Sequence, residues 1–331
     1  MSGAALSRPG RVVVTGSVAF DYLMRFPGKF VEHLIPDRLS RLSVSFLVDE
    51  MRRVPGGCGP NIAYSLVLLG ETPLLFAAAG RDAGEYRDRL ARDGVDVSGL
   101  RLYEDVFTAS FFVSTDRDQN QIASFYTGAM ARAGDLSIGS LDAATIALVV
   151  VSPNDPAAMA RYVAECRTLQ VPFLYDPSQQ VARLTGEELR EGMDGASIVI
   201  VNDYEFGILT NKTGLSPEEV EERIPVLVVT HGAEGSTISV AEKGGSRRER
   251  VPAAKLEREA LDPTGVGDAF RAGLIRGLRI GSPWPIAGRM GSVAAVYALE
   301  ALGPQPGRYS KQEFRERYFR NFGTEAVLEN L

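Results

Sequence analysis

Short, almost continuously apolar runs recur along the chain, and stretches with helical patterning lie between them. The apolar runs are rich in β-branched residues and predict buried strands. They lie at 12–16, 74–79, 146–151, 172–175, 198–201 and 227–230. The predicted helices lie at 61–69, 84–92, 157–169, 186–193, 267–279 and 285–302. Strands that are apolar on both faces and alternate with helices predict an α/β protein, with a mostly parallel central sheet flanked by helices.

Two segments interrupt this alternation. Residues 20–54 mix aromatic and charged positions, and apolar and polar residues alternate over 42–48, which predicts a strand with one face in solvent. Residues 109–115 and 121–126 are strand-like runs joined by a polar turn, which predicts a hairpin. We interpret both segments as excursions from the main core into a smaller sheet.

Composition narrows the class of protein. The chain has 331 residues, of which 45% are hydrophobic and 24% charged, values typical of a soluble globular protein. This length fits two domains or one larger α/β domain with an appendage. The formal charge of −6 argues against broad capture of nucleic acid. Two cysteines and two histidines make neither a disulfide framework nor a zinc cluster. No apolar run is long enough to span a membrane and no secretory signal precedes the first strand, so we expect a cytoplasmic location.

The glycine-rich segment 262–268, Asp-Pro-Thr-Gly-Val-Gly-Asp, directly precedes a predicted helix. Glycines let backbone N–H groups converge there, and the helix N-terminus adds partial positive charge, so the segment could hold a phosphoryl group. Asp268 would stand at the mouth of this anion hole and could accept a proton from an attacking hydroxyl. A glycine-rich turn with a capping aspartate explains the same residues.

A second glycine-rich segment, 56–61, also precedes a predicted helix. Gly57 would allow close approach of a ligand to the backbone, and the Asn61 amide could bond sugar hydroxyls. Asp21 follows the first strand, at the edge where doubly wound sheets bind ligands, and a carboxylate there could hold vicinal hydroxyls. A structural turn with Asn61 as a cap and a solvated Asp21 are the plainer alternatives.

Three further groups have both functional and structural interpretations. Asn202 and Glu205 could orient water on Mg²⁺, but they also form the N-x-x-E pattern of a capping box. The glycine-rich turn after the strand at 227–230 could lie over a nucleotide or be a simple turn. Amides and aromatic rings elsewhere could read and stack on a base, or belong to a loop and a hairpin core. These last residues are Gln179, Gln180, Phe111 and Phe125.

Taken together, these segments resemble the ribokinase or PfkB family of sugar and nucleoside kinases. The signatures occur in the family's order: Gly-Gly with Asn61, N-x-x-E at 202–205, and D-x-T-G-x-G-D at 262–268. The resemblance runs from Gly16 to about Ala298, with Val266 where the family more often has alanine. Stretches such as DPSQQ, VNDYE and DPTGVGDAFRAG more closely resemble the bacterial adenosine kinases of the mycobacterial type.

The resemblance implies a ribokinase-like fold with a small β-sheet lid. The core for nucleotide and substrate would comprise 1–20, 55–103 and 128–331, and the lid 21–54 and 104–127. In this subgroup the lid resembles a clasp between two subunits, so we expect a homodimer.

The resemblance also assigns roles to individual residues. Asp268 matches the catalytic base, and Gly265, Val266 and Gly267 match the anion hole. Asp21, Gly57 and Asn61 match ribose contacts, to which Ser17 is a candidate addition, while Gln179, Gln180, Phe111 and Phe125 match the surroundings of the base. Asn202 and Glu205 match the phosphate environment, with Glu205 reaching Mg²⁺ through water, and Thr230, Gly232 and Gly235 match the nucleotide turn. The implied cofactors are ATP and Mg²⁺, with K⁺ near 303–305.

The expected activity is transfer of the γ-phosphoryl group of ATP to the 5′-hydroxyl of adenosine, giving AMP. The same chemistry on another nucleoside, or on a free sugar such as ribose or fructose, is the alternative within the family. A binding or regulatory protein that lost turnover is a second alternative. A dinucleotide-dependent oxidoreductase is disfavoured, because the first turn lacks the G-x-G-x-x-G of a pyrophosphate cradle.

Overall fold

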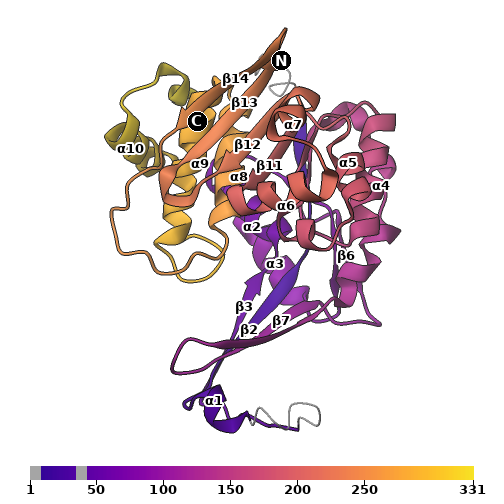
Figure 1. The fold of residues 1–331 in the computed structure, drawn as a ribbon, viewed down its shortest axis with the longest axis vertical. Helices are drawn as coiled ribbons and strands as arrows, with labels where there is room; N and C mark the ends of the chain where they lie inside the picture. The colour runs from indigo at the N-terminus through magenta and orange to yellow at the C-terminus, as the bar shows by residue number, and fades with distance from the viewer. Residues whose placement is uncertain (1–8, 35–42) are drawn as a thin grey trace.

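A central eight-stranded sheet forms the main body of the computed structural model, which describes residues 9–34 and 43–331 (Figure 1). Its strand order is β14-β13-β12-β11-β10-β9-β1-β4. Pairing is parallel from β4 to β12, and β13 and β14 add an antiparallel edge. The strands are β1 (Arg11–Thr15), β4 (Leu74–Leu75), β9 (Ile146–Val151), β10 (Phe173–Tyr175), β11 (Ile198–Asn202), β12 (Val226–Thr230), β13 (Ser236–Glu242) and β14 (Gly245–Val251).

Helices cover both faces of this sheet, which is why its strands are apolar throughout. In β1, for example, Val12 and Val14 pack into the core on one face and Val13 into the core on the other. One face is covered by α2 (Cys58–Leu68), α3 (Gly84–Asp93), α8 (Val266–Arg279), α9 (Trp284–Leu299) and α10 (Lys311–Phe322). The other is covered by α4 (Pro156–Thr168), α5 (Gly186–Met193), α6 (Asp203–Thr213) and α7 (Pro217–Arg223). The predicted fold class is confirmed.

A separate four-stranded sheet projects from the main body, with the short helix α1 (Phe30–His33) at its tip (Figure 1). Its order is β3-β2-β7-β8, formed by β2 (Ala19–Arg25), β3 (Glu50–Gly56), β7 (Ala109–Thr115) and β8 (Gln121–Tyr126). Ala19, Ala109 and Met130 form a small buried cluster where this sheet joins the body. A third, two-stranded sheet pairs β5 (Ala77–Gly80) with β6 (Leu100–Tyr103).

The excursions do form a smaller sheet, and the hairpin of 109–126 is confirmed. The strand predicted at 42–48 is wrong for its described part, because residues 43–48 are irregular and the strand lies at Glu50–Gly56 instead. That strand is charged and contains Pro55, which an edge strand tolerates because one side of its backbone has no partner strand.

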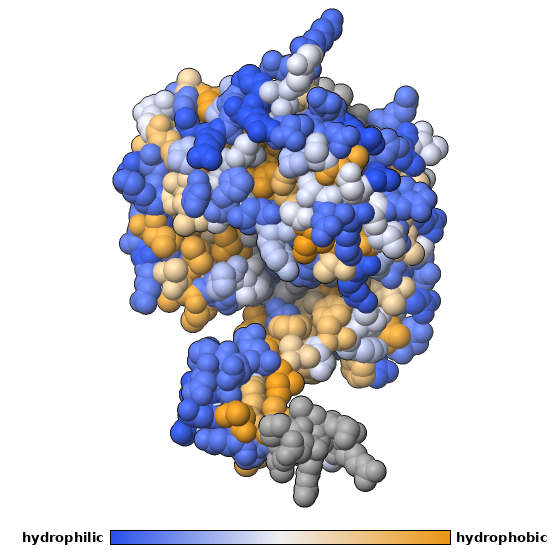
Figure 2. Space-filling view, in the orientation of Figure 1, coloured by the Kyte–Doolittle hydropathy of each residue, from blue (hydrophilic) through white to orange (hydrophobic). Residues whose placement is uncertain are grey.

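The projecting sheet and its flanking residues expose large apolar side chains. In Figure 2 the projecting part meets the body at a narrow neck, and apolar atoms gather on it. The exposed apolar residues of this region are Leu23, Val31, Leu47, Met51, Phe112, Ile122, Phe125 and Tyr126. A monomeric protein seldom leaves so many together in solvent, so this sheet is a candidate contact surface. Within 9–34 and 43–331, no helix has the length and apolar character that crossing a bilayer requires.

Candidate active site

A cavity of about 580 Å³ lies between the carboxyl edge of the central sheet, the projecting sheet and the N-termini of α2 and α8. Ligands of doubly wound proteins bind at this edge, because strand ends and helix N-termini meet there. Most of the predicted acceptor-side and transfer residues line this cavity. They are Ser17, Asp21, Gly57, Asn61, Phe111, Phe125, Gln179, Gln180, Gly265, Gly267 and Asp268.

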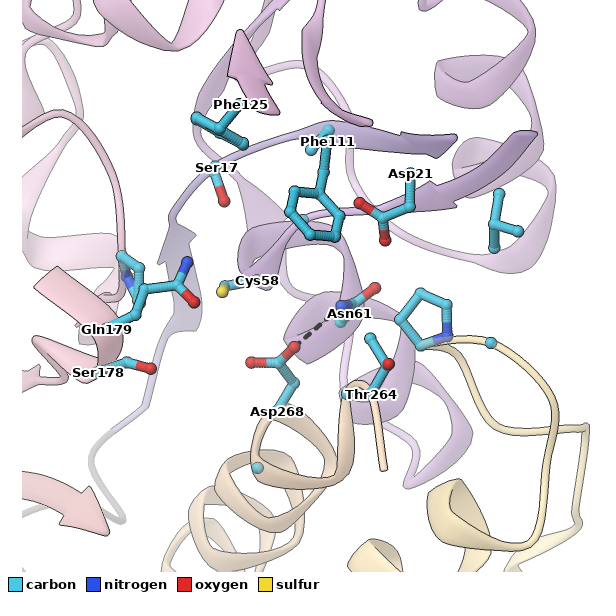
Figure 3. Close-up of a pocket in the computed structure, with 18 of the residues that line it drawn as sticks. Ser17, Asp21, Cys58, Asn61, Phe111, Phe125, Ser178, Gln179, Thr264 and Asp268 are labelled. Carbon is cyan, nitrogen blue, oxygen red and sulfur yellow. Dashed lines mark hydrogen bonds between the residues drawn. The ribbon is translucent and has the colours of Figure 1, made fainter. Parts of the chain in front are cut away.

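The N-termini of α2 and α8 lie next to each other at the wall of the cavity, where Asn61 and Asp268 meet (Figure 3). Helix α2 begins at Cys58, three residues before the predicted start, because Gly57 (φ 96°) is its N-cap and Pro60 fits in the first turn. A Cβ atom on Gly57 would collide with the carbonyl oxygen of Ser17, so only glycine fits there. Asn61, in the first turn of α2, donates from Nδ2 to Asp268 Oδ2 at 2.9 Å.

Gly265 is the N-cap of α8 and has a left-handed conformation, with φ 76°. Its Cα packs against the carbonyl of Pro304, which a Cβ atom would overlap. The side chain of Val266 packs against the core, so only its backbone belongs to the turn. Gly265, Gly267 and Asp268 line the cavity, so the start of this helix lies at its wall, where a helix N-terminus can hold an anion.

Asp268 is only 9% exposed, and burial raises the pKa of its carboxyl. The guanidinium of Arg271 and the hydrogen bond from Asn61 both oppose that rise in pKa. Oδ2 is held by Asn61, and the second carboxylate oxygen turns into the cavity (Figure 3). This arrangement can accept a proton from a ligand hydroxyl.

Arg271 and Asp176 form a buried ion pair beneath Asp268, which the sequence analysis missed. Arg271 Nη2 donates to Asp176 Oδ1 at 2.6 Å, and Nε contacts Oδ2. Burial raises the pKa of Asp176 to about 7, although the Arg271 charge opposes that rise. The pair joins β10 to α8 across 95 residues of sequence, so no local spacing predicts it.

Asp21 lies on β2 between Val54 of β3 and Phe111 of β7. Burial, and secondarily the charge of Asp262, raise the pKa of Asp21 to about 6. Among the residues that the structure describes, none donates a hydrogen bond to this carboxylate. Its oxygens are therefore available to a ligand that brings its own hydroxyl donors.

The two phenylalanines predicted near a base are neighbours in the projecting sheet, where Phe111 pairs with Phe125. Figure 3 shows Gln179 with its amide turned into the cavity and Phe111 beside Asp21. Gln180 is buried, and its Nε2 donates to the carbonyl of Asn154 at 2.8 Å. Gln179 turns its amide into the cavity, whereas Gln180 is held to the loop through Nε2, and its Oε1 has no partner among the described residues.

The predicted nucleotide residues do not line this cavity. Asn202 and Thr230 end β11 and β12 and are direct neighbours in the sheet, so they continue the same edge. Gly232 and Gly235 shape the turn that follows Thr230. Asn202 and Glu205 form the capping box of α6, with bonds of 2.7 and 2.8 Å.

Glu205 is buried, and besides the cap it accepts a bond from Ser178 at 3.3 Å. Within the described part of the chain, no three His, Cys, Asp or Glu side chains gather into a metal site. Mg²⁺ suits such surroundings, because it keeps several waters and takes few protein ligands when phosphates are present.

Further residues line the cavity without having been singled out as contacts, among them Cys58, Met130, Arg183, Asp262 and Thr264. Asp262 and Thr264 belong to the glycine-rich motif, where their position could have indicated a contact. Arg183 and Met130 carry no sequence signal. Burial and the nearby charge of Asp268 raise the pKa of the Cys58 thiol, which keeps it protonated and a poor nucleophile.

Comparisons with known proteins agree with this geometry. The family described as "pfkB family carbohydrate kinase" matches residues 14–310. A solved structure of Burkholderia thailandensis nucleoside kinase with inosine is 36% identical, with a TM-score of 0.83, covering 95% of this chain and 99% of that one. The same protein with ADP and inosine gives a TM-score of 0.81 at 36% identity, covering 95% and 97%. A nucleoside kinase of Methanothermobacter thermautotrophicus is 29% identical over 98% of this chain and its own whole length.

Proposed function

This chain belongs to the pfkB family of carbohydrate kinases and is a phosphotransferase acting on a hydroxyl group, and from this premise we propose that it is an ATP-dependent nucleoside kinase. The proposed acceptor is the 5′-hydroxyl of a purine nucleoside, with adenosine giving AMP as the first candidate. The observation that carries the proposal is the position of Asp268, between the glycine turn of α8 and a cavity that also holds Asp21 and two phenylalanines.

Asp268 is the proposed general base. Its free carboxylate oxygen takes the proton of the 5′-hydroxyl as that oxygen attacks the γ-phosphorus of ATP, and ADP leaves. Burial of Asp268 strengthens it as a base by raising its pKa, while the Arg271 charge and the hydrogen bond from Asn61 oppose that rise.

The turn at Gly265, Val266 and Gly267 is the proposed anion hole. Negative charge on the transferring phosphoryl group is stabilised there by backbone N–H groups that the helix start already orients. Preorganisation matters, because donors fixed by the fold need no rearrangement during the reaction.

The residues around the phosphoryl acceptor are proposed to bind both the ribose and the base of a nucleoside. Asp21, Asn61, Gly57 and Ser17 surround the ribose, where the Asp21 carboxylate can accept from two vicinal hydroxyls. Phe111 and Phe125 offer faces for stacking, and Gln179 offers an amide to the base edge. The Burkholderia thailandensis relative was solved with inosine, which supports a nucleoside and leaves the choice among purines to experiment.

The nucleotide is proposed to lie along the neighbouring strand ends, at Asn202, Thr230 and the turn through Gly232 and Gly235. Glu205 would hold Mg²⁺ through water, and the metal when bound supplies positive charge to the ATP phosphates. K⁺ near 303–305 belongs to the same proposal, because Pro304 touches Gly265 of the anion hole.

The projecting sheet is the proposed lid, with the domain boundaries given by the resemblance, 21–54 and 104–127. Closing it over the acceptor excludes water, which would otherwise compete for the phosphoryl group. Its exposed apolar side chains also support a homodimer through this sheet. Sedimentation equilibrium tests the dimer: a purely monomeric species at micromolar concentration would contradict it.

The test of the function is ADP release from ATP and Mg²⁺ with a panel of adenosine, inosine, guanosine, cytidine, ribose and fructose. We expect nucleosides to exceed free sugars, since a free sugar leaves Phe111, Phe125 and Gln179 unused. Asp268→Asn should abolish turnover while nucleoside binding, measured by calorimetry, persists. Near-normal kcat in that variant would remove the assignment of the base, and turnover on sugars alone would remove the nucleoside.

A further inference from the structure

A directional chain of hydrogen bonds reaches Asp268 from the opposite side of α2. Arg89 of α3 donates from Nη2 to Gln305 Oε1. Gln305 Nε2 in turn donates to Asn61 Oδ1 at 3.3 Å, and Asn61 Nδ2 donates to Asp268 Oδ2 at 2.9 Å. Four segments far apart in sequence are thus linked in one chain, which ends at the Asp268 carboxylate.

Each amide in this chain has only one orientation that satisfies its neighbours. Arginine can only donate, so it requires the oxygen of Gln305 to face it. The second N–H of Gln305 goes to the Tyr86 hydroxyl at 2.9 Å, and that hydroxyl donates onward to the Gly56 carbonyl at 3.1 Å. Rotating the Gln305 amide by half a turn would set its NH₂ against Arg89 and its oxygen against Asn61 Oδ1.

The orientation of Asn61 follows from that of Gln305. Because Gln305 offers a donor, Asn61 turns its oxygen toward Gln305 and its NH₂ toward Asp268. A flipped Asn61 would place its oxygen against an ionised carboxylate, with both acceptors buried and one donor unpaired.

We propose that Gln305 is a positioning residue for phosphoryl transfer: it fixes the Asn61 amide so that Oδ2 of Asp268 is occupied and Oδ1 receives the proton of the acceptor hydroxyl. This inference rests on the proposed function, because it takes Asp268 as the base. Gln305 lies in the loop after α9 and acts only through Asn61.

The electrostatic surroundings of Asp268 allow the effect to be measured. The charged and titratable groups around it are Arg271 on α8, Asp176 after β10 and the Cys58 thiol on α2, and the carboxylates of Asp21 on β2 and Asp262 before α8 line the same cavity. The bond from Asn61 lowers the pKa of Asp268. Losing that bond while Arg271 and Asp176 stay in place should therefore shift the acid limb of the kcat/KM profile to higher pH.

The experiment compares Gln305→Leu with Gln305→Glu. Leucine removes the donor to Asn61, and we expect a fall in kcat on the order of tenfold with the acid limb about one pH unit higher. Glutamate keeps a partner for Arg89 but presents an acceptor to Asn61, which draws the NH₂ away from Asp268. We therefore expect Gln305→Glu to be the more stable variant and the less active one.

A residue with only a structural role would give the opposite order, with Gln305→Glu more active than Gln305→Leu, and that result would overturn the proposal. Gln312→Leu, at an exposed glutamine that bonds Glu316 on α10, is the matched control and should leave the pH profile unchanged.

A double-mutant cycle separates this inference from the proposed function. In an Asn61→Ala background, Gln305→Leu should have no further effect on kcat or on the acid limb. An undiminished effect there would show that Gln305 does not act through Asn61. If Asp268→Asn loses turnover while both Gln305 variants keep the parent profile, the positioning role fails and the base stands. If Asp268→Asn retains turnover, the proposed base fails, and the positioning role fails with it.

Discussion

The carboxylate of Asp21 should make the ligand-free protein less stable at neutral pH. Its pKa rises from 3.8 to about 6 in the folded chain, because it is buried and lies near Asp262. A carboxyl with a raised folded-state pKa binds its proton more tightly in the folded chain than in the unfolded one. Its favourable contribution is complete below pH 4 and is lost as the pH rises through 6.

The size of the effect follows from the pKa difference. A rise from 3.8 to about 6 corresponds to about 3 kcal/mol of unfolding free energy at pH 8, and about half of that at pH 5. Asp21→Asn removes the titration and keeps the shape, so it should stabilise the protein by these amounts. For a chain of 331 residues, about 3 kcal/mol raises Tm by about 4 °C.

Urea unfolding of the parent and Asp21→Asn at pH 5 and pH 8 measures the difference. Asp88→Asn, at an exposed aspartate of α3, serves as the control and should change little with pH. A stabilisation by Asp21→Asn that is equal at both pH values, or absent at pH 8, would refute the reasoning. The same variant should weaken nucleoside binding by about tenfold or more, because an amide cannot accept from two ribose hydroxyls equally well.

Three further predictions concern other parts of the site. Arg271→Met should lower the unfolding free energy by about 3–5 kcal/mol, because it leaves the buried Asp176 without its ion-pair partner. Adding Asp176→Leu should recover much of this loss. A loss below about 1 kcal/mol for Arg271→Met alone, measured by urea unfolding, would contradict the prediction. Gly265→Ala should reduce kcat strongly and Tm only slightly, because the new Cβ meets the Pro304 carbonyl and displaces the glycine turn of the anion site. Steady-state kinetics with nucleoside and ATP varied measure this, and an unchanged kcat would show that the turn is not used. Phe111→Ala and Phe125→Ala should raise KM for nucleosides by about five- to tenfold and leave any turnover of ribose unchanged, and equal effects on both acceptors would argue against stacking.

The fold could be predicted from sequence wherever a strand is buried on both faces. The runs at 146–151 and 198–201 have no polar position, and only a covered parallel sheet explains that. The edge strands were harder. Strands β13 and β14 carry polar residues on one side and were not predicted. Strand β3 was not predicted because its arginines and its proline are not typical of a strand.

The glycine-rich turns were predictable because glycine leaves a local signal, and Gly57 and Gly265 indeed adopt positive φ at the starts of two helices. Side chains that meet across the sheet leave no local signal in the sequence. Arg271 and Asp176, or Gln305 and Asn61, become neighbours only when the whole sheet has formed, over separations of 95 and 244 residues. Their partners are selected by topology, so one sequence alone cannot pair them.

The projecting sheet is formed by two insertions in the chain, and neither one interrupts the order of the parallel strands. Residues 19–56 are inserted between β1 and α2, and residues 109–126 are inserted between β6 and β9. The glycine turn of α8 belongs to a different part of the chain altogether. Grafting these two insertions from a relative would therefore exchange Asp21, Phe111 and Phe125 of the proposed acceptor side, while Gly57, Asn61, Gln179 and the glycine turn of α8 stay as they are.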